Sequence, residues 1–360
     1  MPQVVSQTLP LSQRMIIEGL GGVAEIADCG QLPSLLPGTV LVRTEAVALN
    51  PSDYKMGRAF PCPGAVVGHD FAGYIIAISP DIQTHFRVGD RVCGAVHGSN
   101  PADESNGAFA QYVRASPGLL LHIPADMAFE QAAGLGLGLA TTCLALWGTA
   151  LRLEWNPEAP CMEPPVAVLV YGASTATGTM ALQLLRLSGL APIAICSTHN
   201  FKLVYQYGAT IAFDISEPNL TEKIRKHTNN ELRFALDCIT DLASVTCCYA
   251  SMRRIGGRYA CLEFCPPELQ TRRAVRAEFV MALEVFGKDV DLPGGYGRQS
   301  SAEKKNEAVR WFRLFQKLLD AGEIRPHPFQ LLPPNFEGVM EGLALLQRGD
   351  ISGTKLVALV

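Results

Sequence analysis

Two adjacent residues, His69 and Asp70, carry side chains that are common in metal and acid–base chemistry. They stand in the stretch "VVGHDFAGYIIAIS", between glycines and ahead of an alternating apolar run. A catalytic zinc takes about three protein ligands from Cys, His and carboxylate side chains and leaves one position open. The turn "ALNPSDYKMG" contains no Cys or His, and the stretch 92–109 has one cysteine where a structural zinc needs four. The sequence therefore predicts no metal, and His69 either has a structural role or lines a cleft.

A second group of residues forms a candidate phosphate-binding turn. The stretch "VLVYGASTATGTMALQLLRLSG" reads as a strand, a small-residue turn and a helix, with glycines at Gly172 and Gly178. Backbone amides and the dipole at the start of a helix attract a pyrophosphate. The residues between the glycines keep the backbone approachable and offer hydroxyl groups: Ser174, Thr175, Ala176 and Thr177. The turn predicts a dinucleotide site, and the alternative is a tight strand-to-helix turn without a ligand.

The residues after the next predicted strand bear on the choice of dinucleotide. An NAD-specific site has Asp or Glu about 20 residues beyond the glycines, where it holds the ribose 2′-hydroxyl. This chain has "ICSTHNFK" there, with donors and potential positive charge on Ser197, Thr198, His199, Asn200 and Lys202. These side chains suit a 2′-phosphate, so NADPH is favoured over NADH. The alternative is that they only cap the following helix.

The elements that must position these residues fall into two patterns. Short strands at close spacing run to about Ile123 and predict a β-rich domain. A helix capped by Asp126 follows, and the Pro- and Glu-rich loop "EWNPEAPCMEPP" marks a boundary. From Val166 strands and helices alternate, which is typical of a doubly wound parallel sheet. The predicted fold class is α/β, with domains at residues 1–160, 161–290 and 291–360.

Composition excludes several classes of protein. The chain has 360 residues, 48% hydrophobic and 18% charged, with a net charge of −4, so there is no basic footprint for nucleic acid. Its 11 cysteines include no C-x-x-C pair, which indicates reduced thiols in the cytoplasm. Residues 131–151 carry no charge, but their Gly-Leu alternation and two threonines favour a buried core helix over a membrane span.

Several motifs together resemble a known family. "NPSDYKM", "GHDFAGYIIAIS", "VGDRVCGA" and "GAFAQYV" are similar to the zinc-free medium-chain dehydrogenase/reductase superfamily. "YGASTATGTMALQLLRLSG", "CSTHNF", "ALDCIT" and the terminal "GDISGTKLV" resemble, more narrowly, the trans-acting enoyl reductases that serve fungal polyketide synthases. The resemblance covers almost the whole chain. It implies a GroES-like catalytic domain that is split by an NADPH-binding Rossmann domain, with the last residues returning to the first domain.

The resemblance also implies site residues. The family's cofactor contacts match Ser52, Asp53, Tyr54, Lys55, Gly172, Ser174, Thr175, Ala176, Thr177, Ser197, Thr198, His199, Asn200, Leu262, Glu263, Ile351 and Ser352. Its substrate-lining positions match Thr141, Thr142, Cys143, Leu144, Ala145, Leu146, Trp147 and Gly148, with Leu283, Glu284, Val285, Phe286 and Gly287. Family members often place a Tyr near the adenosine where this chain has Ile215, and Tyr207 is the expected substitute.

The activity that the resemblance implies is reduction of an enoyl thioester on the carrier protein of a partner polyketide synthase, by a monomeric enzyme. Hydride passes from NADPH to the β-carbon and a proton to the α-carbon. Lys55 is the candidate proton donor or electrostatic stabiliser, and otherwise a cofactor-binding or surface lysine. Tyr54 and Thr141 are further candidates for hydrogen bonds to the thioester, and a water is another source of the proton. Two other functions stay open, a free-standing quinone or alkenal reductase and a non-catalytic NADPH-binding partner of a synthase.

Overall fold

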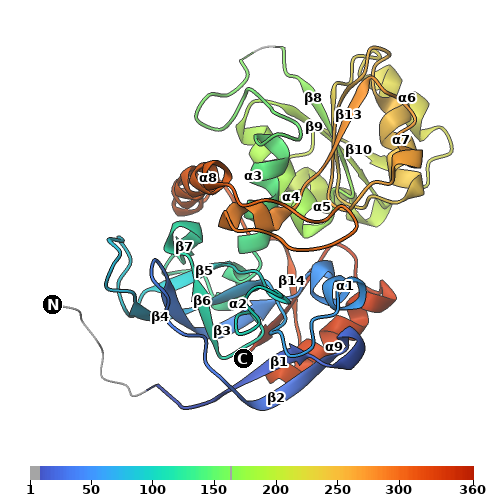
Figure 1. Cartoon of the computed structure of the whole chain (residues 1–360). Helices are drawn as coiled ribbons and strands as arrows, with labels where there is room; N and C mark the ends of the chain where they lie inside the picture. The colour runs from blue at the N-terminus through green and yellow to red at the C-terminus, as the bar shows by residue number, and fades with distance from the viewer. Residues whose placement is uncertain (1–8, 163) are drawn as a thin grey trace. The chain divides into compact units, whose positions relative to one another are not determined.

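The computed structural model describes residues 9–162 and 164–360, which form two units (Figure 1). Unit 1 contains the described residues up to Leu137 together with Phe286–Val360, and unit 2 is Gly138–Val285. Unit 2 thus begins before the predicted boundary at residue 161. The residues in between belong to it because Arg258 Nη1 donates to the carbonyls of Thr149 and Ala150, at 3.1 Å each, and Cys161 N donates to Ser188 O.

Unit 1 is built on a seven-stranded sheet that joins the early and the last parts of the chain. The strand order is β14–β15–β3–β4–β5–β7, and β6 also pairs with β3. All neighbours are antiparallel except β14 and β15. The bounds are β3 Val40–Ala48, β4 Asp70–Ile78, β5 Arg91–Ala95, β6 Tyr112–Ala115, β7 Leu120–His122, β14 Phe329–Leu331 and β15 Lys355–Leu359.

The remaining elements of unit 1 cover this sheet or extend from it. A hairpin, which the sequence analysis did not predict, consists of β1 (Gln13–Glu18) and β2 (Ala24–Gly30). Helix α9 (Asn335–Arg348) buries Phe336, Val339 and Leu343 in the same core as Phe71 and Leu356. The other helices are α1 (Pro51–Ala59), α2 (Phe129–Ala132) and the amphipathic α8 (Ala302–Asp320). Leu49, which directly precedes the N-cap of α1, belongs to this core, and its backbone N donates to Leu356 O in β15 at 2.9 Å. The core therefore holds the start of α1 close to the C-terminal strand.

Unit 2 confirms the predicted doubly wound parallel sheet. Its six strands are ordered β10–β9–β8–β11–β12–β13, and all neighbours are parallel. Helices α4 and α5 lie on one face and α6 and α7 on the other (Figure 1). The bounds are β8 Ala167–Tyr171, α4 Ala176–Leu187, β9 Ala191–Cys196, α5 Phe201–Gln206, β10 Ile211–Asp214, α6 Leu220–His227, β11 Phe234–Asp237, α7 Leu242–Ser251, β12 Gly257–Cys261 and β13 Val275–Phe279. The strand order reverses between β8 and β11, which is where ligands bind in sheets of this kind.

The uncharged segment near residue 131 contains two helices, α2 and α3 (Gly136–Leu146). Asp126 does not cap α2, contrary to the prediction, because residues 124–127 form a turn and Ala128 is the N-cap. Residues Phe129–Leu146 are long and apolar enough to cross a membrane by length and composition alone. However, 67% of this stretch is buried within the protein, as in the core helix of a globular domain.

The glycines of α3 differ in how closely they pack. A Cβ atom on Gly136 would lie 2.2 Å from the carbonyl carbon of Gly94 in β5 and 2.6 Å from Ala95 N. A Cβ atom on Gly138 would meet nothing within 4 Å. Close packing against β5 therefore explains Gly136, whereas a side chain at Gly138 would enter open space.

We expect Gly136→Ala to lower the free energy of unfolding by about 2 kcal/mol or more, because the new methyl group meets backbone that must shift. Gly138→Ala is the matched control and should be neutral or slightly stabilising, since alanine is the better helix former by about 1 kcal/mol. Urea unfolding of both variants measures the difference. Equal effects of the two substitutions would contradict this account of α3.

Candidate functional site

The turn after β8 has the geometry of a phosphate-binding loop. Gly172 has a φ of +72°, a left-handed conformation that favours glycine. Thr175 caps α4, because its Oγ1 accepts a hydrogen bond from Gly178 N at 3.0 Å. A Cβ atom on Gly178 would lie 2.5 Å from Gly172 O, so only glycine lets the helix approach the strand this closely. The structure thus has the strand, turn and helix that the sequence indicated.

The predicted residues after β9 lie beside this turn. Asn200 is 7% exposed, and its Nδ2 donates to Ser174 Oγ at 3.1 Å. Ser197, Thr198 and His199 precede it directly after the end of β9 at Cys196. A direct contact therefore joins the two stretches that the sequence assigned to the cofactor.

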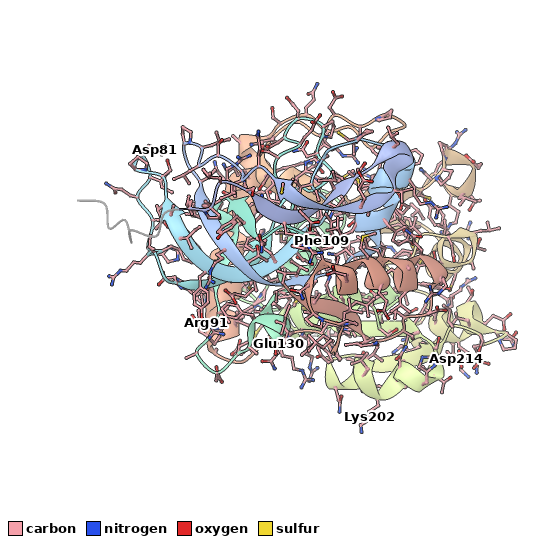
Figure 2. All side chains as sticks on the ribbon, turned by 90° about the horizontal axis from the view of Figure 1, so that it is seen from below. Asp81, Arg91, Phe109, Glu130, Lys202 and Asp214 are labelled. Atoms are coloured by element: carbon pink, nitrogen blue, oxygen red, sulfur yellow. The ribbon has the colours of Figure 1, made fainter. Side chains whose placement is uncertain are left out.

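One acidic residue in this region was missed by the sequence analysis. Asp214, the last residue of β10, accepts a hydrogen bond from Thr198 Oγ1 and others from Ser216 N and Oγ. The hydrogen bond from Thr198 and those from Ser216 hold the pKa of the Asp214 carboxyl below its usual value. The signal that could have found it is strand register, since Asp214 pairs with Cys196. Figure 2 labels Asp214 together with the exposed Lys202 of α5.

A buried carboxylate organises the loop after β11, and the sequence analysis missed it as well. Asp237 is fully buried and accepts hydrogen bonds from Ile239 N and Thr240 N, at 2.9 Å each, and from Tyr259 Oη at 2.8 Å. Burial raises the pKa of Asp237, and these hydrogen bonds oppose the rise. They hold Thr240 at a φ of +61°, which is rare for a β-branched residue. Ile239 consequently lies against the turn, since a Cβ on Gly172 would be 2.8 Å from its Cγ1.

The remaining predicted cofactor residues of unit 2 follow other strands of the same sheet. Leu262 and Glu263 come directly after β12, and Leu262 N donates to Asp237 O at 3.1 Å. Ile215 follows β10 and is 41% exposed, while Tyr207 at the end of α5 is buried. Because all strands are parallel, the residues that follow β8, β9, β10 and β12 collect at one edge of the sheet.

Unit 1 holds a second polar cluster, centred on the start of α1. His69 Nδ1 lies 2.5 Å from Asp53 Oδ1, and Asp53 Oδ2 accepts from Asn50 N at 2.6 Å. Asn50 Nδ2 donates to Asp70 Oδ2 at 2.9 Å, and Lys355 Nζ lies 3.0 Å from the same oxygen. His69 is 1% exposed and paired, as expected for its structural alternative. Among residues 9–162 and 164–360, no group of three or more His, Cys, Asp or Glu side chains could hold a metal ion.

Some buried polar atoms of unit 1 suggest a missing partner. Within the described part of the chain, Ser52 Oγ, His97 Nε2 and Ser99 Oγ are buried and have no hydrogen-bond partner. Ser52 was predicted to contact the cofactor, and an unpaired buried hydroxyl in α1 fits a group that a bound ligand completes. His97 lies near His69 and Lys288, and burial is the main cause that lowers its pKa to about 3.

The other predicted residues of unit 1 have varied surroundings. Tyr54 packs against the hydrophobic core, and Lys55 is exposed on α1. Ile351 also packs against this core, and Ser352 follows it before β15. Tyr54 and Ile351 are each half-buried, so a cofactor could contact only their exposed sides.

The predicted substrate-lining residues are mostly buried. In α3, Thr141 to Leu146 are between 0% and 8% exposed, and Thr142 Oγ1 donates to Gly138 O at 2.9 Å. Trp147 and Gly148 are half-buried, and Trp147 Nε1 donates to Trp155 O. In the second stretch Leu283 and Val285 are buried, Glu284 and Phe286 are half-buried, and Gly287 has a φ of +67°. Their role as a substrate pocket stays a prediction.

The low pKa of His97 predicts how stability depends on pH. In the unfolded chain a histidine titrates near pH 6.5, so between about pH 6.5 and pH 3 the unfolded state binds the extra proton. The stability that neutral His97 contributes is therefore present above that range and lost as the pH falls. With His97→Asn, the free energy of unfolding should change less steeply with pH. We expect the slope between about pH 6 and pH 4 to fall by up to about 1.4 kcal/mol per pH unit. Urea unfolding at several pH values tests this, and parallel curves for both proteins would contradict it.

Comparisons with known proteins agree with this architecture. Residues 36–125 match the alcohol dehydrogenase GroES-like domain. The chain is similar to solved structures that include an alcohol dehydrogenase superfamily protein from Novosphingobium aromaticivorans, with a TM-score of 0.77 and 21% identity over 97% of this chain and 100% of that one. The CurK enoyl reductase has a TM-score of 0.72 and 17% identity over 97% and 99% of the two chains. These likenesses confirm the predicted fold class.

Relatives at higher identity identify the family. The chain is 47% identical to the trans-enoyl reductase ccsC of Aspergillus clavatus, over 97% of this chain and 96% of that protein. It is 44% identical to the trans-enoyl reductase poxP of Penicillium oxalicum, over 100% of this chain and 96% of that protein. The chain therefore belongs to the family of trans-enoyl reductases, which are oxidoreductases with the medium-chain dehydrogenase/reductase fold.

Proposed function

We propose that this protein reduces the α,β-double bond of a polyketide enoyl thioester, carried on the acyl carrier protein of a partner synthase, with NADPH as the hydride donor. The observation that carries the proposal is the near full-length likeness to trans-enoyl reductases in a chain whose predicted cofactor residues collect at one edge of a parallel sheet. The proposed location is the cytoplasm, which the free state of all eleven cysteines supports. A monomer that docks transiently with the synthase is the proposed form.

When bound, NADPH would supply the hydride for the β-carbon, and the protein would bind and orient cofactor and substrate and stabilise the charge that develops. The amides at the start of α4, with Thr175 as cap, would hold the pyrophosphate. Negative charge then develops on the thioester oxygen, and Lys55 is the proposed electrostatic stabiliser or proton donor. Lys55 is exposed on α1, two residues after Asp53, which the backbone amide of Asn50 holds in place. Tyr54 and Thr141 are the other candidates for a hydrogen bond to the thioester.

The preference for NADPH is proposed from the charges beside the turn. His199 and Lys202 follow β9 and offer donors to a 2′-phosphate. Asp214 is the opposing charge, because a carboxylate repels a phosphate and accepts from a 2′-hydroxyl. Its oxygens already accept hydrogen bonds from Thr198 and Ser216, which occupy acceptor positions that a 2′-hydroxyl would use. These donors are neutral, so the negative charge of Asp214 remains.

The direct test follows NADPH oxidation by absorbance with crotonyl and longer 2-enoyl thioesters, with a quinone and an alkenal in parallel. We expect turnover with thioesters that rises when the acyl group is attached to a carrier protein, because the carrier is the proposed partner. Turnover with quinone or alkenal alone would indicate the free-standing reductase. NADPH binding without turnover of any acceptor would favour the non-catalytic partner.

The same assay separates the roles of Lys55. Lys55→Met should lower kcat by more than about tenfold with the Kd for NADPH unchanged if the ammonium group stabilises the transition state. A rise in the Kd for NADPH at constant kcat would assign Lys55 to cofactor binding, and no change would make it a surface lysine.

Cofactor choice has its own test in charge variants. Lys202→Ala should raise the KM for NADPH about three- to tenfold and leave the KM for NADH unchanged, as expected for one partly exposed charge pair of about 0.5–1.5 kcal/mol. Asp214→Asn should lower the KM for NADPH, because it removes a repelling charge. Lys226→Ala on α6 is the matched control for general loss of positive charge. Steady-state kinetics with both dinucleotides measures these values, and an equal effect of Lys202→Ala on NADH would contradict a 2′-phosphate contact.

A further inference from the structure

We propose that Lys355 is a positioning residue, whose buried ammonium group fixes the start of α1 and thereby the Ser52–Lys55 segment. Lys355 is the first residue of β15 and is 7% exposed. Its Nζ lies 2.6 Å from Asn50 Oδ1 and 3.0 Å from Asp70 Oδ2. The lysine thus contacts both the N-cap of α1 and the first residue of β4, although it lies 305 residues beyond Asn50.

Asp70 is the reason that a cation is needed here. Its carboxylate is fully buried, and a buried charge is costly unless it is paired and hydrogen-bonded. Oδ2 pairs with Lys355 Nζ and accepts a hydrogen bond from Asn50 Nδ2, while Oδ1 accepts one from Leu137 N at 2.7 Å. Both carboxylate oxygens are therefore occupied, and Lys355 is the cationic group among these contacts.

The network continues from Lys355 into α1. Asn50 Oδ1 accepts a hydrogen bond from Lys355 Nζ, and the backbone N of Asn50 donates to Asp53 Oδ2 at 2.6 Å. Asp53 in turn pairs with His69 at 2.5 Å. The hydrogen bonds therefore run without a break from the last strand to the helix that carries the candidate cofactor and catalytic residues.

This inference rests on the proposed function for the role of α1, but its structural part can be measured separately. Amide hydrogen exchange in residues 51–59 reports whether α1 keeps its N-terminal anchor. The Kd for NADPH, from the fluorescence of the bound nicotinamide, reports the consequence for the cofactor.

The experiment compares three variants of the full chain with the parent protein. Lys355→Met removes the ammonium group, and Lys355→Met combined with Asp70→Asn removes it without leaving a buried carboxylate unpaired. Val357→Ala is the matched control, because Val357 lies in the same strand, is 1% exposed and has no polar side-chain group that could join the network. If Lys355→Met does not fold, the double variant decides.

In both Lys355 variants we expect the amide hydrogens of α1 to exchange at least fivefold faster than in the parent protein. The Kd for NADPH should rise at least fivefold. The double variant should recover much of the Tm that Lys355→Met loses, without recovering NADPH binding. Val357→Ala should lower Tm and leave both readouts unchanged. The proposal is overturned if the double variant has the α1 exchange rate and the Kd for NADPH of the parent protein. It is also overturned if Val357→Ala changes both quantities as much as the Lys355 variants do. A parent protein that binds no NADPH would instead refute the proposed function, and α1 exchange would still decide the role of Lys355.

Discussion

The buried contact between the Lys355 ammonium group and the Asp70 carboxylate joins the two chain segments that make up unit 1. A charged pair at this depth persists only if every remaining donor and acceptor finds a partner, and loss of one member typically costs roughly 3–5 kcal/mol. Asn50 and Leu137 N complete the pair on the carboxylate side. The seven-stranded sheet, the start of α1 and the start of α3 therefore share one electrostatic constraint, and the closing strand β15 is part of the site's framework.

Unit 2 uses a buried carboxylate in a comparable way. The Asp237 carboxylate accepts hydrogen bonds from two backbone amides and a tyrosine hydroxyl. These bonds hold the loop after β11 in a strained conformation against the Gly172 turn. Strained backbone of this kind persists where the surroundings determine it strongly, and it clusters at functional sites. In both units, then, a carboxylate at a strand end orders the segment that carries the candidate cofactor residues, while the exposed side chains remain available for the ligand.

Much of the site in unit 2 follows from sequence pattern because its signals are local. The glycines, the small hydroxylated turn and the polar residues after the next strand lie within 30 residues, and parallel strands bring their carboxyl ends to one edge. Asp214 escaped this reasoning because it lies on a third strand, and its proximity to Thr198 depends on the register of β10 against β9. The hairpin β1–β2 escaped it because neither strand, QRMIIE or AEIADCG, alternates strictly between apolar and polar residues. The edge strand β13, VRAEF, does alternate but was not predicted.

The sequence by itself determined the α/β class, the doubly wound sheet, the glycine turn before α4 and the family, since each depends on periodicity, on glycine at special backbone positions or on contiguous motifs. Only the tertiary structure decided what His69 does. Its partner Asp53 is 16 residues away, and the cation of the same cluster, Lys355, comes from the opposite end of the chain. Such contacts have no sequence signature, because packing of the whole sheet brings the residues together and the need to neutralise a buried carboxylate selects them.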